Sequence, residues 1–124
     1  MTETWAFAGD DIAVTPEEAV AGLRQRITEG SLETWFTSSA GHRLSLLPRT
    51  ERALVMLLGA DGDPGGHAVT AGARGLSGGF RLANGQCDTY PDEDTVPLDE
   101  ALGIVGQLIG TGVPSAGAGW REDG

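Results

Sequence analysis

The segment from Asp88 to Ala101 concentrates acidic side chains that could take part in catalysis or binding. It reads DTYPDEDTVPLDEA and holds six carboxylates, one tyrosine and no basic residue. Carboxylates at this density can serve as acid–base catalysts, bind a metal ion or face a basic partner. They are also typical of a solvated loop that leads into a helix.

The catalytic and metal-binding interpretations lack the residues that they need. A glycosidase-type pair requires two carboxyl groups opposed across a cleft, whereas these acids are neighbours in one loop. His42, His67 and Cys87 have neither metal-ligand spacing nor the surroundings of a nucleophile. We therefore expect no catalytic residue, and we expect Cys87 to be a small buried apolar side chain.

The stretch DGDPGG imitates the start of a calcium loop. Asp61 and Asp63 have the spacing of the first two ligands, and Gly66 lies at the turn position. Gly65 offers no side-chain oxygen, however, and Gly72 stands where a bidentate glutamate is needed. The glycine-rich loops also lack the lysine of a P-loop. We expect turns here, without a metal ion or a cofactor.

A basic protein partner is the interpretation that the neighbouring residues favour. Tyr90 lies among Asp88, Asp92, Glu93 and Asp94. Tyrosine is a frequent interface anchor, and acids around it would orient an arginine-rich partner. We predict that these five residues form a partner-binding surface, and a solvated loop is the alternative.

The charge of the chain is compatible with a basic partner. The 124 residues carry a formal net charge of −10, with eight arginines and no lysine. Residues 1–81 contribute −3 and residues 82–124 contribute −7. Such a field repels nucleic acid and anionic membranes and attracts basic proteins, although acidity alone also keeps a protein soluble.

Two amphipathic helices are predicted. Residues 15–29 begin with Thr15 as N-cap, Pro16 in the first turn and Glu18 as the partner of a capping box. Residues 97–110 carry an apolar stripe behind Pro97. Both helices are expected on one face of a sheet.

Between the helices the pattern is that of strands. LETWFT, HRLSLL, ALVMLL and HAVTA are candidate strands, and Asn84-Gly85 predicts a hairpin with a two-residue turn. That turn would oppose Arg81 to Asp88, direct Cys87 to the core and turn Tyr90 outward. The expected fold is therefore α+β, one domain over residues 1–124, with an antiparallel sheet of about four to six strands. Residues 1–12 are a candidate flexible segment.

The compartment expected from the sequence is the cytoplasm. A single cysteine excludes an intrachain disulfide and fits a reducing environment. The N-terminus has no signal-peptide pattern, and no stretch approaches the roughly 20 apolar residues of a membrane span.

The C-terminal third, from Phe80 to Trp120, resembles an immunity protein family of bacterial polymorphic toxin systems. The residues that carry the resemblance follow one another in a fixed order: the turn glycine Gly85, Tyr90-Pro91, the acidic stretch, Val96-Pro97, Thr111-Gly112, Pro114 and Trp120. Leu108 replaces an aromatic residue of that family, and Val113 replaces a basic or polar one. The resemblance covers about 40 residues.

The resemblance implies a non-enzymatic inhibitor. Members of that family are typically encoded beside nucleic-acid deaminase toxins, whose clefts should be basic and hold an extruded base. An immunity protein would bind such a toxin and cover its active site. The alternative is a small acidic ligand-binding or regulatory α+β domain without a toxin partner.

Overall fold

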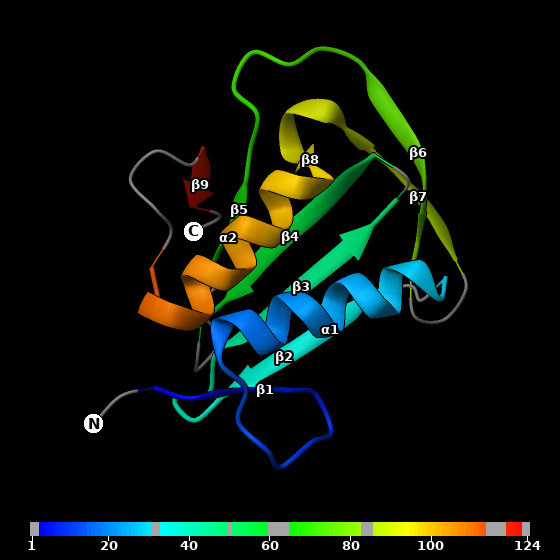
Figure 1. Cartoon of the computed structure of the whole chain (residues 1–124). Helices are drawn as coiled ribbons and strands as arrows, with labels where there is room; N and C mark the ends of the chain where they lie inside the picture. The colour runs from blue at the N-terminus through cyan, green and yellow to red at the C-terminus, as the bar shows by residue number, and fades with distance from the viewer. Residues whose placement is uncertain are drawn as a thin grey trace.

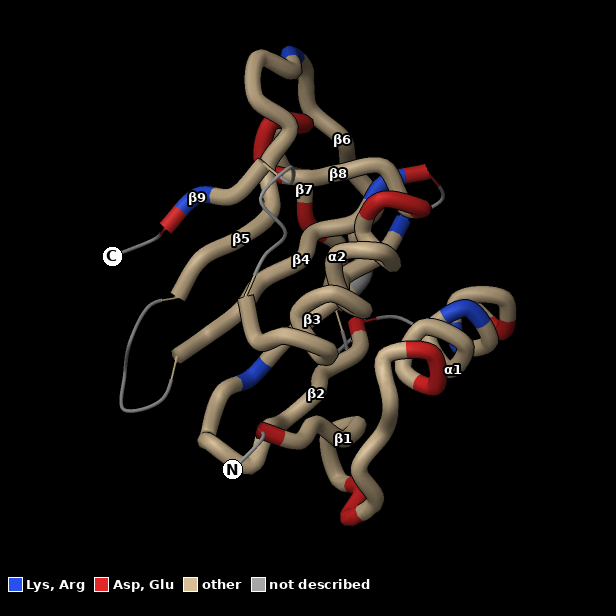
Figure 2. The backbone as a smooth tube through the Cα atoms, turned by 60° about the vertical axis from the view of Figure 1, so that its left-hand side comes forward, with Lys and Arg blue, Asp and Glu red and all other residues tan. Residues whose placement is uncertain are grey.

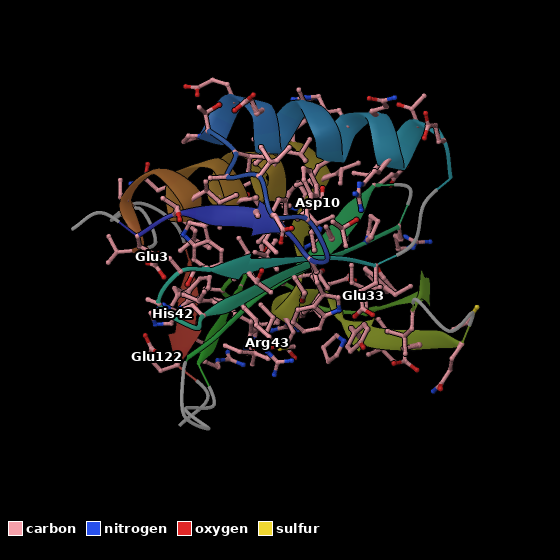
Figure 3. All side chains as sticks on the ribbon, turned by 90° about the horizontal axis from the view of Figure 1, so that it is seen from below. Glu3, Asp10, Glu33, His42, Arg43 and Glu122 are labelled. Carbon is pink, nitrogen blue, oxygen red and sulfur yellow. The ribbon has the colours of Figure 1, made fainter. Side chains whose placement is uncertain are left out.

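Two helices cover one face of an antiparallel sheet, and a hairpin packs on the other face (Figure 1, Figure 3). This computed structural model describes residues 3–30, 33–49, 51–59, 65–82, 86–113 and 119–122. The predicted α+β class, with two main helices on one antiparallel sheet, is confirmed.

The helices follow their local sequence signals. Helix α1 spans Pro16–Thr28, and Thr15 and Glu18 form the predicted capping box with bonds of 2.9 and 3.1 Å. Helix α2 spans Leu98–Thr111 and ends at Gly112, whose φ of 79° is the left-handed conformation that glycine favours. No helix in the described part of the chain is long and apolar enough to cross a membrane.

The main sheet runs in the order β1-β2-β3-β4-β5-β9, and β8 also pairs with β4. Its strands are β1 (Trp5–Phe7), β2 (Thr34–Ser38), β3 (Arg43–Pro48), β4 (Arg52–Leu58), β5 (Gly66–Ala68), β8 (Val96–Pro97) and β9 (Trp120–Glu122). Strands β1, β8 and β9 were not expected, because two or three residues give no readable alternation. The candidate flexible segment 1–12 contains β1, which pairs with β2.

The main core lies between the sheet and the helices. Alternate residues of β3 and β4, including Leu44, Leu46 and Val55, are fully buried there. Leu23 of α1 and Val105 of α2 pack onto the same face. The sheet and both helices therefore share one hydrophobic core, and this core fixes the start of α2 relative to the sheet.

The hairpin consists of β6 (Leu76–Arg81) and β7 (Cys87–Pro91), and its predicted register is wrong by one residue. Phe80 lies opposite Asp88, and the Leu82 N–H donates to the Gln86 carbonyl at 2.8 Å. Three residues, rather than two, therefore separate the last hydrogen-bonded pair, and these residues, 83–85, with the predicted Asn84-Gly85 turn, lie outside the described residues. A slip of one residue exchanges the two faces of a strand.

The observed register gathers three apolar side chains of the hairpin on one face. Phe80, Leu82 and Tyr90 pack together against Leu47 and Leu54, on the sheet face opposite the helices. The predicted register would have separated Tyr90 from Phe80. Burial of three apolar side chains on one face explains the preference for the observed pairing.

Two further predictions depended on the predicted register. Cys87 is exposed rather than directed to the core. Arg81 lies opposite Cys87 in the register, whereas the prediction had placed it opposite Asp88. Strand β6 also has a bulge between Ser77 and Phe80, where Gly79 has a φ of +84°.

Candidate functional site: the acidic turn

The three acids Asp92, Glu93 and Asp94 form a single 3₁₀ turn, here called the acidic turn, between β7 and β8. Its backbone is tied to the loop before β6. The Asp92 N–H donates to the Gly75 carbonyl at 3.0 Å, and the Thr70 N–H donates to the Glu93 carbonyl at 2.8 Å. The backbone of the acidic turn is therefore anchored to the rest of the fold, and the turn holds three carboxylates in a fixed arrangement.

Arg121 of β9 bridges two of these carboxylates. One terminal nitrogen lies 2.8 Å from Glu93 Oε1, and the other lies 3.1 Å from Asp94 Oδ1. The same Asp94 oxygen lies 3.0 Å from His67 Nε2 on β5. The side chains of Glu93 and Arg121 are 40% and 48% exposed, so that pair contributes little stability, about 0–1 kcal/mol.

Arg52 holds the turn from beneath. Its Nε donates to Thr95 Oγ1 at 2.6 Å, and its Nη2 lies 3.1 Å from the Asp92 carbonyl and 2.9 Å from the Thr95 carbonyl. The same nitrogen lies 3.2 Å from Thr70 Oγ1. Thr95 is fully buried. One half-buried guanidinium thus fixes the backbone where the acidic turn meets β8.

Tyr90 does not point freely outward, because the corrected register places it on the packed face. Its ring meets Phe80 edge to face, with centroids 5.3 Å apart, and its hydroxyl donates to Asp88 Oδ2 at 3.0 Å. Partial burial and the adjacent Asp88 carboxylate raise the pKa of Tyr90 above its ordinary value of 10.0. Tyr90 is half-buried and supports the edge of the predicted surface.

The titration of Tyr90 tests this placement. Tyr90 is the only tyrosine in the chain, so tyrosinate absorbance near 295 nm reports on it alone. We expect a midpoint above pH 10 in the folded protein and an ordinary midpoint in urea. A raised folded-state pKa gives stability that is complete below the unfolded value and is lost as pH rises through the folded one.

Tyr90→Phe is the matched control, because it removes the absorbance change and keeps the ring contact. An unshifted midpoint in the folded protein would mean that Tyr90 is neither buried nor bonded to Asp88.

The structure brings the five predicted surface residues into two adjacent groups. Asp88 and Tyr90 bond to each other on β7, and the three acids of the acidic turn follow directly. Local patterns did not identify Arg52, His67 and Arg121, because they lie 18 to 43 positions from their partners. The only visible signal was Arg52 itself, a charged residue at the entrance of an apolar strand.

The two histidines and Cys87 occupy separate places. His42 Nδ1 lies 2.6 Å from Glu3 Oε2, and both are labelled in Figure 3. Although partial burial raises the pKa of Glu3, hydrogen bonds from Ser38 and His42 lower it more, so its net shift is downward. His67 bonds to Asp94, and Cys87 is exposed on the hairpin.

The described residues contain no group of three or more His, Cys, Asp or Glu that could hold a metal ion. Asp61 and Asp63, the ligands of the imitated calcium loop, lie outside the described residues. What the acidic turn offers chemically is a set of fixed carboxylates, two of which form ion pairs with Arg121, while Asp94 also contacts His67. No protein family model, curated protein or solved structure matches the chain.

Proposed function

We propose that this protein is an immunity protein. It binds a cognate bacterial toxin of the nucleic-acid deaminase class in the cytoplasm of the producing cell, and it covers the basic active-site cleft of that toxin. It acts by binding, not by catalysis. The resemblance described above, from Phe80 to Trp120, is the first support, and the charge of the surface is the second.

The surface charge carries the proposal. Seven exposed carboxylates have no hydrogen bond or ion pair in the described ranges: Asp10, Asp11, Glu17, Glu51, Asp99, Glu100 and Glu122. By contrast, the acids of the acidic turn are engaged within the protein. Carboxylates without a counter-charge lose least when a basic partner covers them.

Several of these carboxylates gather at the start of α2. The Leu98 N–H donates to the Glu51 carbonyl at 3.0 Å, which places Glu51 beside the first turn that carries Asp99 and Glu100. Figure 2 shows acidic residues at the beginnings of both helices. The acidic turn precedes this group by one short strand. A basic cleft laid over this end of the molecule would meet both groups.

Co-expression with the neighbouring toxin tests the proposal. The toxin expected is a deaminase domain with a His-x-Glu and a Pro-Cys-x-x-Cys signature at the end of a large secreted protein. Bacteria that express this domain alone should die, and bacteria that also express the wild-type protein should survive. Equal killing with and without a well-expressed immunity protein would reject the proposal.

A further inference from the structure

A groove of about 510 Å³ runs between α1 and α2 on the outer side of the helices. Its walls come from one face of each helix: Glu17, Val20 and Arg24 on α1, and Asp99, Leu102 and Gly106 on α2. The residues of each set recur three or four positions apart, which places them on one face of a helix. The floor is mostly apolar, because Leu102 and Val20 pack on the core beneath it.

The two helices run antiparallel along the groove. A Cβ on Gly110 would lie 3.2 Å from Pro16, and a Cβ on Gly106 would lie 3.3 Å from Val20. The start of α1 therefore meets the end of α2. Sterics explain why glycine occupies these two positions, because a larger side chain would push the helices apart.

Close packing of the helices does not explain why glycine occupies position 103. A Cβ added there meets nothing within 4 Å, and its φ is not in the left-handed region. Glycine weakens a helix interior relative to alanine. The absence of a side chain at Gly103 therefore leaves the groove open without serving the packing of the described residues.

The charges along the groove are not balanced. The lining carries two acids, Glu17 and Asp99, and one arginine, Arg24, which lies towards the end of the groove that Asp99 occupies. Glu17 lies at the other end, is exposed, and has no hydrogen bond or ion pair in the described part of the chain. The groove thus combines an apolar floor with one uncompensated negative charge.

We propose that this helix groove receives an apolar side chain from the basic surface of the toxin, next to a lysine or arginine that pairs with Glu17. The inference rests on the proposed function and assigns the anchoring site within it. An apolar anchor in a groove supplies affinity, and the neighbouring cation supplies orientation and a faster encounter. In this arrangement the acidic turn belongs to the rim of the interface with the toxin and does not provide the anchoring site.

Two substitutions at Gly103 test the site. Binding of each variant to the purified, catalytically inactive toxin domain is measured by titration calorimetry. Gly103→Ala adds one methyl group in open space, so its affinity should stay within about twofold of wild type and its denaturation midpoint should not fall. Gly103→Phe fills the groove, so its affinity should fall by about 30-fold or more, the effect of losing a central anchor.

A charge pair on α1 gives an independent readout. Glu17→Gln should weaken binding about fivefold at low salt and reduce its salt dependence. Glu29→Gln, which removes an exposed carboxylate at the opposite end of α1, should change affinity less than twofold. A loss of affinity in both variants would point to a general charge effect and would overturn the site.

The outcomes separate this inference from the proposed function. Wild-type affinity in a folded Gly103→Phe variant would overturn the groove and leave the immunity function intact. A wild-type protein that does not bind the toxin would reject both. A wild-type dimer that Gly103→Phe converts to a monomer would also overturn the inference, because a second copy of the chain would then be the occupant.

Discussion

Replacing Arg52 by methionine should lower the free energy of unfolding by about 3 kcal/mol. The change removes four hydrogen bonds from a charged donor, and it withdraws a partner from the buried Thr95 hydroxyl and carbonyl. Hydrogen bonds to charged groups contribute about 1.5–3 kcal/mol each to net stability, and the contributions of neighbouring bonds are not additive. Urea denaturation followed by circular dichroism measures the loss.

Arg74→Met is the matched control for Arg52→Met. Arg74 is exposed and has no hydrogen bond or ion pair in the part of the chain that the structure describes. Its replacement removes the same charge, and we expect a change within about 0.5 kcal/mol. Equal effects at the two positions would show that net charge, rather than support of the acidic turn, explains the loss.

Replacing Trp120 by alanine should cost about 3 kcal/mol, at the low end for removal of a large core side chain. Trp120 pairs with Ala68 on β5 and packs against the main core. Its ring covers Gly66, where an added Cβ would lie 2.5 Å from Nε1. It also shares a cavity of about 210 Å³ with Gly112 and Val113 at the end of α2. Trp120 therefore closes this end of the core.

Trp120→Phe separates packing from contact with a partner. Phenylalanine keeps an aromatic ring over Gly66, so we expect it to recover most of the stability that alanine loses. An unchanged urea midpoint in Trp120→Ala would show that the ring contributes no packing. That result would instead assign Trp120 to the partner-binding surface.

The helices were predictable because their signals are local. Thr15, Pro16 and Glu18 specify the start of α1 within four residues, and the apolar stripe of α2 repeats over four turns. The strands β3 and β4 were predictable for the same reason, since their apolar residues are contiguous or alternate. Short strands such as β9 depend on pairing with a distant strand, so their own residues carry no pattern.

The candidate site was only partly predictable. The acids of the acidic turn and their proximity to Tyr90 follow directly from the sequence. The hairpin register did not follow from the sequence. Asn-Gly suits a two-residue turn, whereas the packing of Phe80 with Tyr90 selects another pairing. The partners of Asp94, Arg121 and His67, lie on other strands, and topology alone brings them to Asp94.

The proposed immunity function is tested by the activity of the neighbouring deaminase toxin domain, measured with increasing amounts of this protein. We expect a one-to-one complex that abolishes deamination at equimolar ratio, with association that slows as salt is added. Unchanged deamination in the presence of a large excess of folded protein at low salt would contradict it. That result would favour the small acidic ligand-binding or regulatory domain instead.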